Sequence, residues 1–325
     1  MPRLELQRLD ASHVPEAARL LAARHRQQRT AQPLLSERFE DEAVTAREVE
    51  EALTRADASG AVAVRAGRVV GFLLGAPKPD PVWGPNLWVE SAGQALDPGE
   101  ERETMRDLYA FAATRWREEG RTAHYVVTPA TDRGLLDAWW RLGFGQQQAH
   151  AVRGLPEQPP RVQGPLVVRP ASREDIPALA RLEVELPRHQ GRAPTFSSGE
   201  LGSVEESTAE WEEDFDDPRF TTFVAERSGL VIGSAVACAL ELSSSNSGLI
   251  RPERAGFLGF VAVLPEHRGV GAGRALGEAA MGWCRQTGFS CIATDWRVTN
   301  LLSSRAWTSM GFEQTFLRLH RLIGF

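Results

Sequence analysis

A glycine-rich segment at residues 265–274 is the part of the sequence best suited by residue type and spacing to bind a ligand. It reads Pro-Glu-His-Arg-Gly-Val-Gly-Ala-Gly-Arg, so that Arg268 precedes Gly269, Gly271 and Gly273. Glycines at this spacing let the main chain approach an anion closely and turn several N–H groups toward it. The segment therefore predicts a binding site for a phosphate or pyrophosphate group.

Two elements must hold this loop in place. The β-branched run Val261-Ala-Val263 predicts a strand that ends before Pro265, and residues 274–287 predict a helix. The N-terminus of a helix carries a partial positive charge, so a strand–loop–helix arrangement strengthens the prediction of an anion site. Two common nucleotide loops are excluded, because no Gly-Lys-Ser/Thr follows and the glycines do not follow Gly-x-Gly-x-x-Gly.

This segment resembles motif A of the GNAT acyltransferase superfamily, which is Arg/Gln-x-x-Gly-x-Gly/Ala after a strand that ends in Val-x-Pro-x-x-Arg. A second pattern of the family is Asn-x-x-Ala-x-x-Leu-Tyr-x-x-x-Gly-Phe, and its spacing is matched by Asn300, Ala306, Trp307, Gly311 and Phe312. The chain departs from that pattern with Ser303 at the small residue, Ala306 at the leucine and Trp307 at the tyrosine.

The resemblance implies acetyl-CoA or another acyl-CoA as the acyl donor, with its pyrophosphate on the glycine loop. The implied loop contacts are Arg268, Gly269, Val270, Gly271, Gly273 and Arg274. In the family, the strand before the loop splays from its neighbour and turns a main-chain N–H toward the thioester oxygen. This makes Val261 and Val263 candidates for main-chain contacts with the donor. Asn300 is implied to reach the pantetheine amides, and it can also cap the helix that follows it.

Asp295 is the candidate general base, because related enzymes can carry a carboxylate at its position. An ordinary aspartate has a pKa of ~3.9 and an alkylamine ~10.4, so Asp295 needs a raised pKa or ordered water to remove the proton. An ion pair with Arg297 on the same strand face is the structural alternative. His189, His267 and His320 are alternative bases.

Trp307 is the second candidate catalytic residue, since the family often has a tyrosine there as general acid. Indole has an N–H donor but no proton to give near neutral pH. An alkyl thiol has a pKa of ~8.5, so a CoA thiolate can leave without an acid. Trp307 is expected either to donate a hydrogen bond to the sulfur or to form an aromatic wall of the pocket.

The chain contains an internal repeat. Pro15 and Gly67 in the first half have counterparts in Pro177 and Gly229, at the same offset in sequence number (177 − 15 = 229 − 67). Further along, Gly143 has its counterpart in Gly311, at an offset that is larger by six. One insertion of six residues in the second copy explains both offsets.

The larger offset shows what each copy is expected to do. It places Glu100, Glu103 and Met105 opposite Arg268, Gly271 and Gly273 of the glycine loop. Acidic side chains repel a pyrophosphate, and the conformational freedom of the glycines is lost. The first copy is therefore predicted to be degenerate, with the fold kept and the CoA site lost.

The repeat and the proline-rich segment 153–166 set the expected domains: 1–154 as the degenerate copy, 155–165 as a linker and 166–325 as the catalytic copy. Each side has its own pattern of strands and helices, which indicates two α/β domains. The resemblance implies two tandem GNAT-like domains of the α/β (α+β) class. Each would have a mixed, mostly antiparallel and twisted sheet flanked by helices.

Composition narrows the possible classes of protein. A length of 325 residues suits two domains, and 42% hydrophobic with 25% charged residues is typical of a soluble protein. The net charge of −6 argues against nucleic-acid and anionic-membrane partners. The N-terminus does not read as a signal peptide. Cys238, Cys284 and Cys291 have no metal-ligand spacing and suit a reducing cytoplasm, so we expect a cytoplasmic protein without a metal site.

Residues 204–217 (VEESTAEWEEDFDD) contain eight acidic side chains. Val204, Thr208, Trp211 and Phe215 recur at helical spacing, which predicts a helix with its acids on the opposite face. One interpretation is a solvated surface helix. The other is that the segment covers the acceptor site and attracts a cationic amine.

The sequence therefore predicts an N-acyltransferase, most simply an N-acetyltransferase, in which a primary amine attacks acetyl-CoA directly. The alternative is a non-catalytic acyl-CoA-binding or interaction module. The sequence leaves open whether the amine belongs to a small molecule or a peptide, and it leaves the oligomeric state open.

Overall fold

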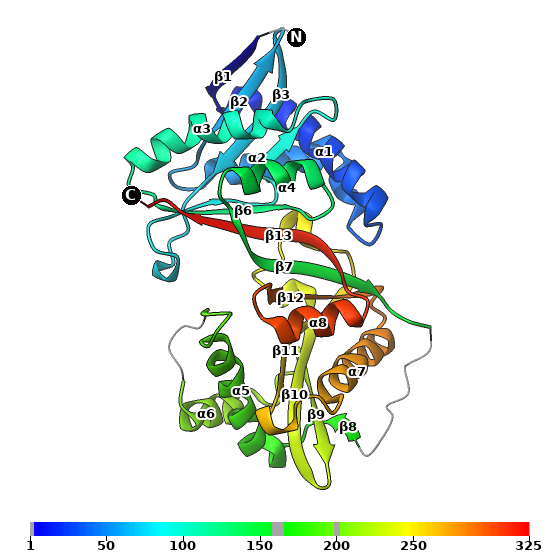
Figure 1. The fold of residues 1–325 in the computed structure, drawn as a ribbon. Coiled ribbons are helices and arrows are strands. Elements are labelled where there is room, and N and C mark those ends of the chain that lie inside the picture. The colour runs from blue at the N-terminus through cyan, green and yellow to red at the C-terminus, as the bar shows by residue number, and fades with distance from the viewer. Residues whose placement is uncertain (1–2, 158–165, 198–201, 325) are drawn as a thin grey trace. The chain divides into compact units, whose positions relative to one another are not determined.

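The computed structural model of the protein describes residues 3–157, 166–197 and 202–324 (Figure 1). The chain forms two compact units. The first comprises Met1–His150, Gly248–Arg251 and Gln314–Phe325, and the second comprises Ala151–Ser247 and Pro252–Glu313. The predicted domain boundaries at 154 and 166 stay a prediction, and residues 158–165 of the predicted linker lie outside the described residues.

The first unit contains a four-stranded antiparallel sheet in the order β1-β2-β3-β5. In a second group of strands, β6 lies between β4, to which it is parallel, and β13, to which it is antiparallel. The strands are β1 (Leu4–Arg8), β2 (Ser59–Arg65), β3 (Arg68–Gly75), β4 (Asn86–Val89), β5 (Gln94–Leu96), β6 (Ala123–Pro129) and β13 (Glu313–Leu322). Strand β7 (Gly145–Gly154) begins in the first unit and ends in the second. The helices are α1 (Val14–Ala31), α2 (Glu42–Thr54), α3 (Glu103–Glu118) and α4 (Arg133–Arg141).

The core of the first unit draws on distant parts of the chain. Leu20 and Leu21 of α1, Phe72 of β3 and Phe316 of β13 are buried in one cluster. Burial of large side chains stabilises a fold by ~1.5–3 kcal/mol each. The end of the chain is therefore an integral part of the first unit.

The second unit is built on a sheet whose strands follow the order β12-β11-β10-β9-β8. They are β8 (Leu166–Pro170), β9 (Phe220–Arg227), β10 (Leu230–Ala239), β11 (Ala255–Val263) and β12 (Cys291–Arg297). The helices are α5 (Ile176–Gln190), α6 (Val204–Asp214), α7 (Ala272–Thr287) and α8 (Leu301–Ser309). In Figure 1, α5 and α6 lie on one side of β10 and β11, and α7 lies on the other.

The two units repeat one strand pattern. In the second unit β11 pairs with β12 through its first half and with β10 through its length. In the first unit two separate strands take these roles, because β4 pairs with β6 and β5 pairs with β3. The larger of the two repeat offsets relates β4 and β5 to the two halves of β11. The tandem fold expected from the sequence repeat is confirmed, as is its mixed α/β class.

The elements predicted beside the site are present. Residues 291–297 form β12, and α6 covers most of the acidic segment with Val204, Thr208 and Trp211 half-buried. Helix α7 begins at Ala272, two residues before the predicted start, because Gly271 takes the N-cap position with a left-handed backbone. The three cysteines are buried, as expected of small hydrophobic residues. No described helix has the length and apolarity needed to cross a membrane.

Candidate functional site

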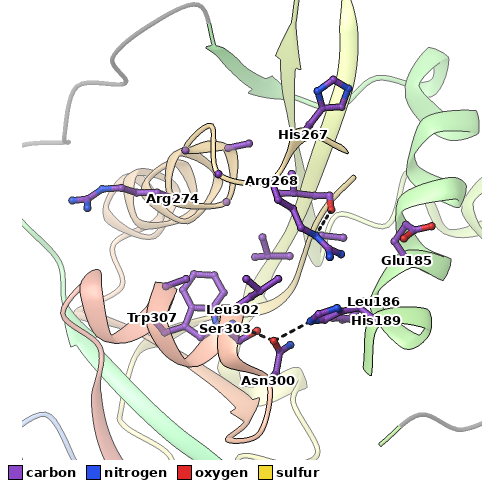
Figure 2. Close-up of a pocket in the computed structure, with 18 residues that line it drawn as sticks. Glu185, Leu186, His189, His267, Arg268, Arg274, Asn300, Leu302, Ser303 and Trp307 are labelled. Carbon is purple, nitrogen blue, oxygen red and sulfur yellow. Dashed lines mark hydrogen bonds between the residues drawn. The ribbon is translucent and has the colours of Figure 1, made fainter. Parts of the chain in front are cut away.

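A cavity of about 370 Å³ lies in the second unit beside the glycine loop. Figure 2 shows its lining, which comes from α5, the end of β11, the loop before α7 and the first turns of α7 and α8. The lining residues are Glu185, Leu186, His189, Val261, Ala262, Val263, His267, Arg268, Gly269, Gly271, Ala272, Gly273, Arg274, Asn300, Leu302, Ser303, Ala306 and Trp307. The structure thus brings together every residue predicted for donor binding except Val270, whose side chain is 37% exposed.

The glycine loop has the backbone that anion binding needs. Gly269 and Gly271 have φ angles of 83° and 90°, in the left-handed region that favours glycine. Gly273 lies in the first turn of α7, where main-chain N–H groups have no partner within the helix. The helical hydrogen bonds of α7 begin with the Ala275 N–H, which donates to the Gly271 carbonyl over 3.0 Å. Unused N–H groups and the helix dipole therefore meet at this end of the cavity.

The two arginines of the loop differ in what they contact. The Arg268 Nε donates to the Val263 carbonyl over 3.4 Å and lies at the cavity (Figure 2). The Arg274 guanidinium forms a 2.9 Å ion pair with Glu278, one helical turn along α7, and points away from the other labelled side chains. Arg268 is therefore the loop arginine better oriented to meet a phosphate, and Glu278 would have to release Arg274.

The strand before the loop is parted from its neighbour. The parallel pairing of β11 with β12 ends at the pair Leu258 and Thr294. The Thr294 hydroxyl donates a hydrogen bond of 2.9 Å to the Leu258 carbonyl. Beyond that point β11 continues to pair with β10, after an irregularity of register opposite Gly259. A gap between strands β11 and β12, as the family resemblance implied, is present at the cavity.

The direction of the main-chain groups at this gap follows from the register. The Leu264 N–H donates to the Ile232 carbonyl of β10 over 2.9 Å. Main-chain groups alternate in direction along an antiparallel strand, so those of Ala262 also face β10. The N–H and carbonyl groups of Val261 and Val263 therefore face the gap, where Arg268 contacts the Val263 carbonyl. Both valine side chains are half-buried, whereas Ala262 is buried against Leu182 of α5.

Asn300 joins two walls of the cavity. Its side-chain oxygen accepts a hydrogen bond from the Ser303 N–H over 3.3 Å, which confirms the predicted cap of α8. The same oxygen lies 3.2 Å from His189 Nε2 on α5 (Figure 2). A carbonyl oxygen only accepts, so the His189 Nε2 donates this hydrogen bond. Sequence reasoning weighed His189 only as a base.

The two predicted catalytic residues occupy different places. Trp307 is 7% exposed, lines the cavity and packs edge-on against Phe312 with ring centroids 5.8 Å apart. Asp295 lies on β12, just after the pairing with β11 ends. Its Oδ2 accepts hydrogen bonds from Ser245 Oγ (2.9 Å) and Asn246 Nδ2 (3.0 Å). The lining of the cavity includes Trp307 but does not include Asp295.

The other two candidate histidines, His267 and His320, lie in different units of the chain. His267 lines the cavity beside the glycine loop. His320 belongs to β13 in the first unit, where its ring centroid lies 6.3 Å from that of Tyr125. Glu185, Leu186 and Leu302 are lining residues that the sequence reasoning missed. For Glu185 and Leu186 the available signal was their spacing of four and three residues from His189 on one helix.

The corresponding place in the first unit is filled by its own side chains. Arg24, Gln94 and Trp139 correspond in the repeat to Leu186 (186 − 24 = 162), Ala262 (262 − 94 = 168) and Trp307 (307 − 139 = 168). Arg24 is buried and donates to the carbonyls of Gln94 and of Ser91, the latter over 2.7 Å. The Trp139 Nε1 donates to Gln94 Oε1 over 3.0 Å. Burial lowers the pKa of the Arg24 guanidinium to about 9.

The loop of the first unit is also changed. Glu100, opposite Arg268 in the repeat, is held by Arg65 Nη2 at 2.9 Å and by the Thr104 hydroxyl at 2.6 Å. Burial by itself would raise the pKa of the Glu100 carboxyl, but these hydrogen bonds outweigh it and hold the pKa below its usual value. A carboxylate therefore stands where the second unit has a cation. Within the described ranges, no group of three or more His, Cys, Asp or Glu residues is placed to hold a metal ion.

The second unit contains nearly all of the part of the chain that matches a known protein family. The model of the acetyltransferase (GNAT) family matches residues 188–312, which include the glycine loop and α8. No curated protein is significantly similar to the chain in sequence.

Solved structures match nearly the whole chain. A GCN5-related N-acetyltransferase from Sphaerobacter thermophilus is 15% identical with a TM-score of 0.56, over 98% of this chain and 96% of that chain. A GCN5-related glucosamine N-acetyltransferase region of a fungal multi-domain GH3 beta-N-acetylglucosaminidase is 16% identical with a TM-score of 0.51, over 98% of this chain and 38% of that chain. The chain therefore has the tandem two-domain fold of the GNAT superfamily, and its residues 188–312 match the acetyltransferase (GNAT) family.

Proposed function

We propose that the protein is an acyl-CoA-dependent N-acyltransferase that moves an acetyl group from acetyl-CoA to a primary amine. The observation that carries this proposal is the gap between β11 and β12, which opens beside the left-handed glycines and the N-terminus of α7. One cavity is therefore lined by main-chain groups of β11 that can bind the amides of pantetheine and by N–H groups of the glycine loop that can bind a pyrophosphate. The reaction forms an amide C–N bond and breaks the thioester C–S bond. An acceptor that arrives as an ammonium ion gives up one proton before it attacks and a second after it, and the CoA thiolate leaves.

The donor is proposed to lie along this cavity. Arg268 and the N–H groups of the glycine loop would hold the pyrophosphate. Val261 and Val263 would offer main-chain groups to the pantetheine and to the thioester oxygen, and a preorganised donor of that kind contributes ~3 kcal/mol in other acyl transfers. Asn300 would reach the pantetheine through its side-chain nitrogen, because its oxygen already accepts two hydrogen bonds.

Asp295 is proposed to assist proton removal. It follows directly after the point where β12 leaves β11, so its backbone borders the gap. The hydroxyl of Ser245 and the amide of Asn246 orient one of its oxygens. The carboxylate is proposed to accept a proton from the amine, directly or through water.

Trp307 is proposed to line the donor site and to donate a hydrogen bond to the ligand from its indole N–H. It is not proposed to act as an acid. In the first unit the equivalent indole donates to Gln94, whereas the second unit has Ala262 at that position, which offers no side-chain acceptor. The N–H is thus suited to meet an acceptor on the ligand.

The cysteines support direct attack by the amine without an acyl-enzyme. Burial raises the pKa of the Cys238 thiol to about 11 and that of Cys284 to about 12. Because the thiolate is the nucleophilic form, these groups are protonated and unreactive near neutral pH.

The first unit is proposed to be a degenerate copy that binds no CoA. Its gap is occupied by Arg24, Gln94 and Trp139, and its loop carries Glu100. A ligand would have to displace buried, hydrogen-bonded side chains and then meet a carboxylate, both of which oppose binding.

A screen of primary amines with acetyl-CoA, read by release of free thiol, tests the proposal. We expect thiol release that depends on the amine and on the enzyme. Acyl-CoA binding without thiol release for any amine would instead support the non-catalytic binding module.

The acceptor is proposed to be cationic, and residues 205–217 are proposed to guide it. Screening acts over ~8 Å at physiological salt, so guidance by exposed carboxylates is mainly a kinetic effect. For an amine that is turned over, kcat/KM should fall as salt rises while kcat holds. A kcat/KM that does not depend on salt would instead indicate that the segment is a solvated surface helix with no part in guiding the acceptor.

A further inference from the structure

A second cavity of about 430 Å³ lies in the second unit, apart from the donor cavity in its lining residues. Aromatic rings form much of its wall: Trp211 and Phe215 from α6 and its C-terminal end, Phe220 from β9, and Phe257 and Phe260 from β11. Strand β11 therefore contributes to both cavities, with Phe257, Gly259 and Phe260 at this one and residues 261–263 at the donor cavity.

The ionisable groups of this wall are mostly acidic. Glu183 of α5 and Glu210 and Asp214 of α6 line the cavity, together with Asp217, which is paired with Arg219 at 2.6 Å. Glu183 accepts a hydrogen bond of 2.8 Å from the Ser207 hydroxyl. Four carboxylates and one arginine line this cavity, whereas the donor cavity has Arg268, the glycine loop and the N-terminus of α7 against Glu185. The two cavities therefore suit ligands of opposite charge.

The mixture of rings and carboxylates restricts the chemistry of the ligand. Aromatic faces attract an ammonium group, and they bury apolar carbon at a gain of ~25 cal/mol per Å². An anion would meet the carboxylates. Both features favour a cation that carries a hydrocarbon body.

We infer that this cavity is the acceptor site and that its ligand is an amine with one ammonium group and an apolar, aromatic or alkyl, body. The inference rests on the proposed function and specifies its substrate class. This inference differs from the guidance proposed for residues 205–217. It requires the ligand to contact the carboxylates and aromatic rings that line the cavity.

Three probes separate charge from apolar body. 2-Phenylethylamine carries both, ethanolamine carries only the ammonium group, and 2-phenylethanol carries only the ring. Binding is measured by calorimetry without acyl-CoA, so the result does not depend on turnover. We expect 2-phenylethylamine to bind at least about tenfold more tightly than either of the others. Equal affinity of ethanolamine and 2-phenylethylamine would overturn the inference.

Matched variants test the lining. Trp211→Ala should weaken 2-phenylethylamine binding about tenfold, while Trp283→Ala, which removes a half-buried indole outside both cavities, should not. Glu210→Gln with Asp214→Asn should weaken it at low and high salt. Glu212→Gln with Glu213→Gln removes the same charge from the same helix outside the lining and should act only at low salt.

The outcomes keep the two proposals apart. Binding that follows this pattern without thiol release would support the assigned ligand class and count against catalysis. Thiol release with amines that lack an apolar body, unaffected by Trp211→Ala, would support catalysis and overturn the assigned class.

Discussion

At the scale of single residues, the candidate site depends on a few side chains whose partners are fixed by neighbours. Arg268 contacts the Val263 carbonyl, whereas Arg274 is committed to Glu278. The family resemblance implied both as loop contacts. The i, i+4 relation of Arg274 and Glu278 was also readable, and it explains why the second arginine points elsewhere.

Substitution of Asp295 tests the proposed base. Asp295→Asn should lower turnover about 10²-fold or more, the usual scale for a lost general base, with acetyl-CoA affinity nearly unchanged. Asn is close in size and can keep the contacts with Ser245 and Asn246 through its amide oxygen. Normal turnover of the variant, measured by thiol release, would show that the base lies elsewhere, and His189 would then be the first residue to replace.

Trp307→Phe tests the proposed role of the indole. Phenylalanine keeps the aromatic wall against Phe312 but loses the N–H donor. Since the thiolate needs no acid to leave, most of the turnover should remain. A loss as large as that expected for Asp295→Asn would contradict a role limited to packing and one hydrogen bond.

At the scale of elements, the site exists because β11 changes partners along its length. Its first half is held between β10 and β12, and its second half is paired with β10 alone among the described strand pairs. Helix α7 packs closely against this strand. A Cβ added at Gly256 would lie 2.2 Å from Cys284 Sγ, so only glycine fits at that contact.

Gly256→Ala should therefore lower the free energy of unfolding by ~1–3 kcal/mol, as overpacked cores do. Cys284→Ala should relieve much of the cost, because the contact at 3.3 Å with Phe289 is the nearest that would then remain. Gly282 lies on α7 like Cys284, and nothing is near a Cβ added there. Gly282→Ala should therefore raise the free energy of unfolding by roughly 0.5–1 kcal/mol. Denaturant unfolding checks all three, and an unchanged Gly256→Ala protein would refute the tight packing.

Two buried histidines give the first unit a pH dependence. Burial lowers the pKa of His25 on α1 and of His124 on β6 to about 4, against 6.5 when exposed. Between these values the unfolded chain binds protons that the folded chain does not, so stability falls as pH drops from about 6.5 toward 4. Above pH 6.5 this contribution is constant.

The expected slope of unfolding free energy near pH 5 is about 2.5 kcal/mol per pH unit for the pair. His25→Asn and His124→Asn should each remove about half of it, whatever their effect on stability at neutral pH. Slopes that match the unsubstituted protein in both variants would contradict the assignment.

The sequence predicted more of this fold than of the site. Hydrophobic periodicity and glycine spacing depend on local chemistry, so the glycine loop, β12, α6 and the repeat could be predicted. The position of Phe316 in the core of the first unit could not, because nothing local shows which sheet a terminal strand joins. Likewise, the contact of Asp295 with Ser245 depends on the tertiary fold, because the two residues are far apart in sequence.

At the scale of the whole molecule, the chain holds two copies of one fold, and they differ in whether the place beside the parted strand is open or filled. In the second unit, Leu186 and Ala262 leave a cavity at the parted strand. In the first, Arg24 and Gln94 occupy the equivalent place and satisfy the main-chain groups that a ligand would otherwise meet. Larger side chains at these two positions therefore occupy, in the first unit, the place that is open in the second.

Calorimetric titration with acetyl-CoA is the most direct test of the claim that only the second unit binds the donor. We expect one site per chain. Gly271→Glu should abolish binding, because it adds a carboxylate at a left-handed position. The matched Gly99→Glu in the loop of the first unit should leave binding intact, and unfolding transitions would verify that both variants fold. Two equivalent sites per chain, or unchanged affinity in Gly271→Glu, would contradict the claim.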